Sequence, residues 1–180
     1  MGGFCIYKKL EIVTVDYKYC DYLREFDKRV IYNAGTKKIR PFIGVLFMVE
    51  NIKYFAPLSS PKPKHKKLKN TLDLIKIKDG EYGVVNLNNM IPLIDGMYTL
   101  VDLNKKYVNK KDIFRIELLT NQLRWLTVNR EDIYFKSKLL YNLYKNNKLP
   151  KNVRNRCCNF ILLEEKCIDY KKEITSFVKS

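Results

Sequence analysis

The stretch of the chain best suited to chemistry is residues 53–69, which read KYFAPLSSPKPKHKKLK. Two adjacent serines, Ser59 and Ser60, follow a short apolar run, and three nearby prolines stiffen the backbone because the proline ring fixes φ at about −65°. The basic and imidazole side chains that follow have no acid among them: Lys62, Lys64, His65, Lys66, Lys67 and Lys69. So much positive charge favours a polyanionic ligand, and we interpret this stretch as the working site. A solvated basic loop without function is the alternative.

Groups of this kind could cleave RNA without a metal. The ribose 2′-hydroxyl attacks the adjacent phosphate if a protein aligns it, moves its proton, protonates the leaving 5′-oxygen and stabilises the added charge. Arg40 and Lys62 could stabilise that charge while the two serines hold the phosphate. His65 is the only histidine, so a mechanism with two imidazoles is excluded. If His65 moves one proton, a tyrosine, a lysine or the substrate itself must move the other; the alternative is that His65 is merely solvated.

Other chemistries find less support in the sequence. No cluster of carboxylates suggests a two-metal nuclease, and no GxSxG, GxGxxG or P-loop motif is present. The five cysteines form no CxxC pair, so we expect neither a metal site nor a cofactor. Cys20 and Cys167 fall on apolar faces of predicted helices and are expected to be small buried hydrophobes in a reducing compartment.

Composition places the chain among globular proteins that bind nucleic acid. It has 180 residues, of which 46% are hydrophobic, and a net charge of +16, which predicts one domain over residues 1–180 with affinity for phosphate backbones. We expect a cytoplasmic protein without a membrane partner, because no apolar run approaches the ~20 residues of a membrane span and the first residues lack the core of a signal peptide. A non-catalytic RNA-binding module and a structural partner protein are the alternatives to an enzyme.

The first half of the chain predicts the elements that position these residues. Residues 10–15 read as a strand, and Asp16 caps a helix running to about residue 27. Its buried stripe is expected to contain Tyr19, Tyr22, Leu23 and Phe26. Residues 31–39 read as a loop, and the strands 42–49 and 52–58 form a hairpin that brings Arg40 and Ser59 to neighbouring strand ends.

The second half predicts more strands and then helices. Residues 72–78, 82–87, 91–94 and 98–103 are four strand candidates, with a two-residue turn at Asp79-Gly80 between the first two. Helices over 113–126 and 133–144 should form a hairpin packed on the sheet, and a closing helix covers 160–177. The predicted fold class is therefore α+β, an antiparallel sheet that curls into a half-open barrel with flanking helices.

A second basic segment, residues 145–156, also contains no acid. We expect it to face RNA together with the basic loop. The RNA-binding candidates are Lys64, Lys66, Lys67 and Lys69 in the loop and Lys145, Lys148, Lys151, Arg154 and Arg156 in this segment.

Five segments of the chain carry a resemblance to a known family. They read YLREFDKRV at 22–30, RPFIGV at 40–45, YFAPLSSPKPKHKKLKN at 54–70, GVVNLNNMIP at 83–92 and CNFILLEEKC at 158–167. In sequence and in order they resemble the toxins of type III toxin-antitoxin systems, the ToxN, AbiQ and CptN endoribonucleases. The resemblance spans nearly the whole chain; the nine residues before Leu10 extend beyond the usual start of the family.

The resemblance implies a Kid- and MazF-like fold, an SH3-like half-barrel with helices around it. It implies cleavage of cellular or phage mRNA without metal, leaving a 2′,3′-cyclic phosphate. It also implies inhibition by a small pseudoknot-like antitoxin RNA encoded as tandem repeats, in cyclic protein–RNA assemblies of two plus two or three plus three. The implied biology is phage defence by abortive infection, or plasmid maintenance.

The resemblance also assigns residues to roles. The essential serine of the family falls on Ser60, preceded by the hydroxyl residue Ser59, and the lysine of its SPK segment is Lys62. Its remaining site positions fall on Arg40, Tyr19 and His65. The resemblance does not separate base from acid, and Tyr19 on a buried stripe has the alternative of being core with its hydroxyl satisfied.

Overall fold

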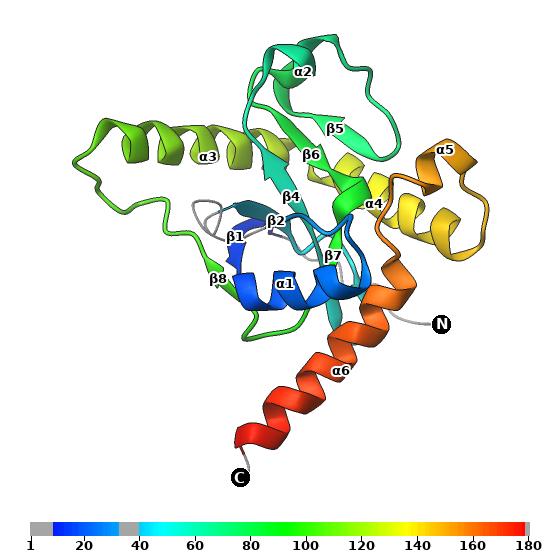
Figure 1. The fold of residues 1–180 in the computed structure, drawn as a ribbon. Helices are drawn as coiled ribbons and strands as arrows, with labels where there is room; N and C mark the ends of the chain where they lie inside the picture. The colour runs from blue at the N-terminus through cyan, green and yellow to red at the C-terminus, as the bar shows by residue number, and fades with distance from the viewer. Residues whose placement is uncertain (1–8, 33–39, 179–180) are drawn as a thin grey trace.

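The computed structural model describes residues 9–32 and 40–178 and shows an α+β fold, an open antiparallel sheet flanked by helices (Figure 1). Within these ranges the strands are β1 Glu11–Val15, β2 Pro41–Gly44, β3 Met48–Val49, β4 Ile52–Ser59, β5 Leu74–Lys76, β6 Val84–Asn86, β7 Ile91–Leu93 and β8 Tyr98–Leu100. The helices are α1 Tyr17–Phe26, α2 Pro63–Lys67, α3 Lys110–Val128, α4 Arg130–Lys145, α5 Lys151–Arg154 and α6 Phe160–Val178, with 3-10 turns η2 Ile77–Gly80 and η3 Leu87–Asn89. The predicted fold class is confirmed.

Strand β4 is the centre of the sheet, whose order is β5-β6-β4-β2-β1-β8. Its first half pairs with β3 and β7, and its second half pairs with β2 and β6, all antiparallel. A continuous apolar run suits a strand that is covered on both faces, and Tyr54, Phe55 and Ala56 are all buried. The Tyr54 hydroxyl donates to Glu164 Oε1 at 2.7 Å, which ties the strand to α6.

The predicted first strand and first helix are present, although the helix buries a narrower stripe than expected. Asp16 caps α1 by accepting the Lys18 N–H at 2.9 Å. Tyr19 and Leu23 are fully buried, but Tyr22 is half-buried and Phe26 is 40% exposed. The centroid of the Tyr22 ring lies 4.8 Å from that of the Tyr170 ring on α6. Helix α6 therefore covers part of the stripe and leaves Phe26 exposed.

The predicted strand over residues 42–49 is interrupted. β2 ends at Gly44, and β3 resumes the pairing with β4 at Met48. A Cβ at residue 44 would lie 2.3 Å from a ring carbon of Phe55, so the strand passes under this ring only as glycine. The residues between the two strands are buried like most of β2, whereas both residues of β3 are half-buried. A continuous apolar run in the sequence therefore did not reveal the break.

The predicted helical hairpin is wrong. Only Asn129 separates α3 from α4, and one residue cannot reverse the direction of a helix, which takes a loop of at least ~2 residues. Figure 1 shows α4 leading away from α3 instead of folding back beside it. The predicted closing helix is confirmed as α6, which extends past the sheet and ends at Val178.

Two expectations lie outside the described residues: most of the loop over 31–39, and the extension before Leu10. The cysteines expected to be buried, Cys20 and Cys167, are both fully buried. None of the helices in the described ranges is long and apolar enough to cross a bilayer.

Candidate active site

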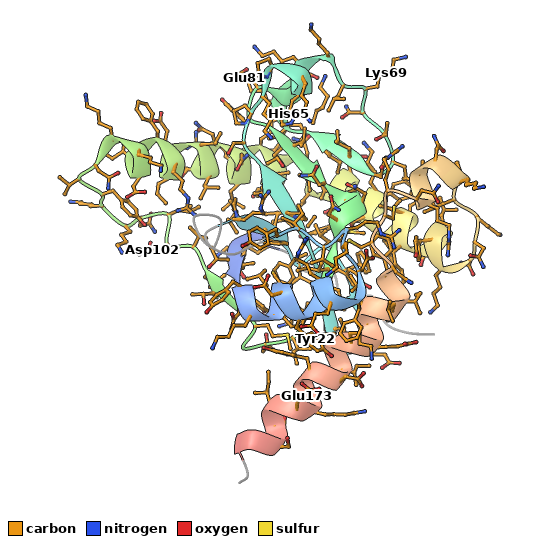
Figure 2. The ribbon with its side chains drawn as sticks, in the orientation of Figure 1. Tyr22, His65, Lys69, Glu81, Asp102 and Glu173 are labelled. Atoms are coloured by element: carbon orange, nitrogen blue, oxygen red, sulfur yellow. The ribbon has the colours of Figure 1, made fainter. Side chains whose placement is uncertain are left out.

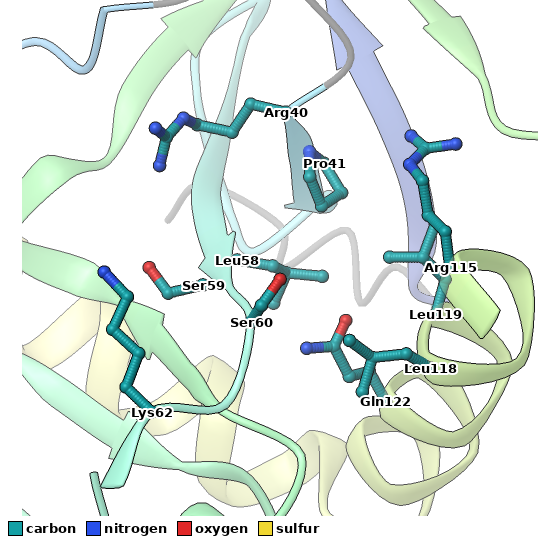
Figure 3. Close-up of a pocket in the computed structure, with 10 residues that line it drawn as sticks. All are labelled: Arg40, Pro41, Leu58, Ser59, Ser60, Lys62, Arg115, Leu118, Leu119 and Gln122. Atoms are coloured by element: carbon teal, nitrogen blue, oxygen red, sulfur yellow. The ribbon is translucent and has the colours of Figure 1, made fainter. Parts of the chain in front are cut away.

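The ends of β2 and β4 and one face of α3 enclose a cavity of about 320 Å³ (Figure 3). This volume is at the lower end of the range for ligand sites, roughly 300–1,000 Å³. Its lining residues are Arg40, Pro41, Leu58, Ser59, Ser60, Lys62, Arg115, Leu118, Leu119 and Gln122. Phe42 lies opposite Pro57 in the β2–β4 ladder, so Arg40 and Ser59 lie at neighbouring strand ends as predicted. Four of the six residues assigned to catalysis therefore meet here.

The two serines face opposite sides of the chain, as successive residues of a strand do. Ser59 ends β4, and its Oγ accepts a hydrogen bond of 2.9 Å from Asn86 Nδ2. Figure 3 shows Ser59 on the side of Arg40 and Lys62, and Ser60 turned towards α3. Ser60 is exposed, and its hydroxyl makes no hydrogen bond to the described residues, so it can bind a ligand.

The turn over residues 77–83 packs closely against the backbone of the two serines. Gly83 has a φ of +96°, and a Cβ there would lie 1.9 Å from the Ser59 carbonyl oxygen. Gly80 has a φ of +88°, and its Cβ would lie 2.8 Å from the His65 carbonyl. The predicted hairpin between β5 and β6 is confirmed, but its connection is longer than the expected two residues because η2 is inserted.

His65 belongs to α2 and is its buried residue, 3% exposed (Figure 2). Its Nδ1 accepts the Lys62 N–H at 3.2 Å, and its own N–H donates to the Lys62 carbonyl at 2.8 Å. Burial, with a smaller effect of Lys62 and Lys64, lowers the pKa of His65. The solvated alternative is therefore wrong. His65 is a neutral cap of α2 that fixes the backbone of Lys62, and it does not line the cavity.

Tyr19 also lies outside the lining of the cavity. It is fully buried, and its hydroxyl donates to the Pro92 carbonyl at 2.8 Å. Burial raises the pKa of Tyr19 well above its usual value. The structure thus shows the alternative that the sequence left open, a core tyrosine with a satisfied hydroxyl.

Arg40 presents a partly buried cation to the cavity. Its Nε is buried and has no hydrogen-bond partner among the described residues. Burial lowers the pKa of Arg40, yet a guanidinium stays charged in proteins. A charge that is withdrawn from water without a partner favours an anionic ligand.

Gln122 on α3 is a lining residue that the sequence reasoning missed. It is 1% exposed, and its Nε2 donates to the Tyr82 carbonyl at 2.6 Å. Its Oε1 is buried without a partner in the described part of the chain. The available signal was its spacing, because Gln122 shares the buried face of α3 with Ile116, Leu119 and Leu126, where an apolar residue is expected.

The two basic segments differ in how their side chains are engaged. The loop lysines expected to bind RNA, Lys64, Lys66, Lys67 and Lys69, are exposed, as are Lys145, Lys148 and Lys151. Arg154 donates to the Tyr144 carbonyl at 2.7 Å and lies 4.1 Å from the Tyr144 ring centroid. Arg156 pairs with the buried Asp73 at 2.9 Å, which holds α5 close to β5 (Figure 1).

The described residues contain no group of three or more His, Cys, Asp or Glu side chains placed to hold a metal ion. Burial raises the pKa of the Cys157 and Cys158 thiols to about 12. At neutral pH these cysteines are therefore inert thiols, because the thiolate is the reactive form.

Comparison with known proteins relates this site to one family. The family model described as "Toxin ToxN, type III toxin-antitoxin system" matches residues 11–168. The endoribonuclease ToxN of Pectobacterium atrosepticum is 34% identical over 91% of this chain and 95% of its own length. The endoribonuclease AbiQ of Lactococcus lactis subsp. lactis is 29% identical over 92% of each chain.

Solved structures of similar proteins have the same fold as this chain. A structure described as "selective toxin inhibition by a non-coding RNA pseudoknot" superposes with a TM-score of 0.76 at 29% identity, over 91% of this chain and 98% of the other. A structure of AbiQ, described as "a lactococcal anti-phage endoribonuclease", superposes with a TM-score of 0.76 at 25% identity, over 91% of this chain and 99% of the other.

Proposed function

The chain belongs to the ToxN family of type III toxin-antitoxin endoribonucleases, and on this premise we propose that it cuts RNA in the cavity between β4 and α3. The observation that carries the proposal is the meeting of Arg40, Ser59, Ser60 and Lys62 around one cavity. Each was assigned to the site from the sequence, and a cavity lined by three cations, Arg40, Lys62 and Arg115, and by two serine hydroxyls suits a phosphodiester.

The proposed reaction is attack of the 2′-hydroxyl on the adjacent phosphate without a metal. The new bond from the 2′-oxygen to phosphorus forms as the bond to the 5′-oxygen breaks, which leaves a 2′,3′-cyclic phosphate and a free 5′-hydroxyl. Arg40 and Lys62 stabilise the charge that develops on the phosphate oxygens, and Ser59 and Ser60 hold the phosphate in line.

In this scheme the groups that transfer protons lie in the cavity and not in the buried core. Tyr19 and His65 lie outside the lining, so we assign His65 the role of positioning Lys62 and Tyr19 a structural role. Lys62 is the one lysine among the described lining residues, and as an ammonium it can protonate the leaving 5′-oxygen. The proton of the 2′-hydroxyl passes to a phosphate oxygen of the substrate or to solvent. Transfer to the substrate is one of the routes that the sequence left open.

We further propose that a small pseudoknot-like repeat RNA inhibits this chain, as a non-coding RNA pseudoknot is described to do for a similar toxin. The exposed lysines of the basic loop and of the second basic segment would bind its phosphates. Toxin and RNA would close into a ring of two plus two or three plus three. Release of the toxin would lead to cleavage of cellular or phage mRNA in the cytoplasm, in abortive infection or plasmid maintenance.

We also propose that residues 1–180 work as one endoribonuclease domain. Buried side chains of the sheet, of α1, α3, α4 and α6 form one continuous apolar cluster. A shared core of this kind makes independent folding of either half unfavourable.

The experiment that tests the function is cleavage of a long RNA in EDTA by the wild type and by Ser60→Ala. The wild type should yield new ends with a 2′,3′-cyclic phosphate, and the variant should be slower by roughly 100-fold to 1,000-fold, the usual cost of one transition-state donor. Both should bind RNA equally in a filter assay. Intact RNA with the wild type across pH 6 to 9, together with salt-sensitive binding, would instead favour a non-catalytic RNA-binding module.

A further inference from the structure

The α3 wall of the cavity contains an acceptor that the proposed reaction does not use. Gln122 is 1% exposed and lines the cavity, and its Oε1 has no hydrogen-bond partner among the described residues. Leaving a buried acceptor unpaired costs folding free energy, so native structures rarely do so without a reason. A ligand that donates a hydrogen bond in the cavity would supply that reason.

The orientation of the Gln122 amide is fixed by its neighbour. Nε2 donates to the Tyr82 carbonyl at 2.6 Å, and a carbonyl oxygen can only accept. The amide therefore cannot flip, and Oε1, which can only accept, is the amide atom left without a partner among the described residues, while the second N–H of Nε2 remains a donor. Figure 3 shows the end of this side chain directed towards Ser60 and the open centre of the cavity.

Apolar side chains lie beside this acceptor. Leu118 and Leu119 on α3 and Leu58 at the end of β4 line the same cavity. Arg40 and Lys62 lie on the side of Ser59, and the third cation of the lining, Arg115, lies on α3 one turn before Leu119 (Figure 3). A nucleotide has this division of chemistry, with a charged phosphate and a flat base that carries a few polar atoms at its edge. About 320 Å³ suits one nucleotide better than a longer segment of RNA.

We propose that Gln122 selects the base beside the cut by accepting a hydrogen bond from an exocyclic amino group, which adenine, cytosine and guanine carry and uracil lacks. This inference rests on the proposed function. The N3–H of uracil is flanked by two carbonyl oxygens, and the neighbouring leucines would leave these oxygens without a donor. Oε1 is closed to water in the free protein, so the base must displace a neighbouring side chain, for which the half-buried Leu118, one turn earlier on α3, is best placed.

The test begins by mapping the wild-type cut sites in a long RNA and identifying the flanking position with the strongest preference for an amino-bearing base. An oligonucleotide cut at one such site is then made with adenosine or with purine riboside, which lacks only the amino group, at that position. For a site that prefers cytosine, the pair is cytidine and 2-pyrimidinone riboside. The wild type should cut the analogue with a kcat/KM lower by roughly 10-fold to 100-fold, the range for one well-placed base contact.

Gln122→Met keeps the length of the side chain and removes both the acceptor and the contact with Tyr82. Whatever its overall rate, this variant should cut the two oligonucleotides with a ratio near one, which a purely structural role of Gln122 would not produce. Full discrimination by Gln122→Met would overturn the proposal, as would equal cleavage of both oligonucleotides by the wild type, even if the variant fails to fold. A wild type that cuts no RNA at all would overturn the proposed function instead.

Discussion

The cavity and the second basic segment, residues 145–156, both contain arginines, but these side chains are engaged in opposite ways. Arg154 and Arg156 each have a protein partner, the Tyr144 carbonyl and the Asp73 carboxylate. Arg40 has its Nε buried without one among the described residues. The sequence shows the same basic composition in both places, so charge alone does not identify the catalytic site.

This difference shows how a cation that binds a ligand can be distinguished from a cation that stabilises the fold. In the second segment the lysines remain free to face RNA while the arginines stabilise the fold. In the cavity a donor on Arg40 and an acceptor on Gln122 are both unpaired within the described part of the chain. Buried polar groups are normally satisfied, so unpaired groups that line one cavity indicate a ligand that pairs with them.

The largest expected effect on stability and cleavage comes from a substitution in the turn over residues 77–83, which packs against the serines. Gly83→Ala should lower the free energy of unfolding by about 2–5 kcal/mol, because left-handed strain adds to overpacking against the Ser59 carbonyl, and cleavage should be lost. Gly96 is the matched control, since its φ is +93° but a Cβ there would meet nothing within 4 Å. Gly96→Ala should cost about 1 kcal/mol and keep activity. Equal unfolding curves for the two variants in urea would contradict the close support of the serines.

Arg156→Ala should affect stability more than catalysis. The Asp73 side chain is 4% exposed, and the variant removes the cation and the two hydrogen bonds that Arg156 gives this carboxylate, at a cost of about 1–3 kcal/mol at pH 7. Burial opposes ionisation of Asp73, but hydrogen bonds from Arg156 and Thr71 outweigh it and lower its pKa.

The pH dependence of the Arg156→Ala effect follows from this lowered pKa. The contribution of the pair is present above the unfolded carboxyl pKa of about 4 and is lost as pH falls through the folded value. The difference in stability between wild type and variant should therefore shrink in acid. A difference that stays constant between pH 7 and pH 3 would exclude the ion pair as its cause.

A smaller effect is expected at His65. Because its pKa is lowered in the fold, protonation is unfavourable there, and its stabilising cap is complete above the unfolded pKa of about 6.5 and weakens as pH falls. Gln in its place can accept the Lys62 N–H without titrating. His65→Gln should match the wild type at pH 8 and lose less cleavage rate between pH 7 and pH 5. Parallel pH profiles would show that another group controls the acid limb.

The smallest effects are expected at single exposed lysines. Lys67→Ala and Lys148→Ala should each reduce the slope of log Kd against log salt for single-stranded RNA by about 0.7, the value for one phosphate contact. Cleavage at saturating RNA should not change, because neither side chain lines the cavity. An unchanged slope for Lys148→Ala would remove the second basic segment from the RNA interface.

Much of the sheet and part of the candidate site could be predicted from the sequence. Apolar strands with turn residues between them indicated an antiparallel sheet, and the hairpin of β2 and β4 correctly placed Arg40 beside Ser59. The break after Gly44 was hidden because residues 45–47 continue the apolar run, and the Phe55 ring that requires glycine at residue 44 lies on another strand. The helical hairpin failed because periodicity reports which face of a helix is apolar and not which way the chain turns at Asn129.

The roles of His65 and Tyr19 could not be predicted for a related reason. A histidine in a lysine-rich stretch and a tyrosine on an apolar stripe show the same pattern whether they face a cavity or the core. Only the contacts in the structure distinguish the two cases. His65 accepts a hydrogen bond from the Lys62 N–H, and the Tyr19 hydroxyl donates one to the Pro92 carbonyl. Gln122 was missed because the partner of its amide lies forty residues earlier, at Tyr82.

The most direct test of this account compares Arg40→Ala with Arg154→Ala in one assay of RNA cleavage at saturating substrate. Arg40→Ala should lower kcat by roughly 100-fold to 1,000-fold, because it removes charge stabilisation at the phosphate. Arg154→Ala, measured below its melting temperature, should stay within a few-fold of the wild type. Comparable losses in both variants, or a near-normal rate for Arg40→Ala, would contradict the assignment of the cavity as the catalytic site.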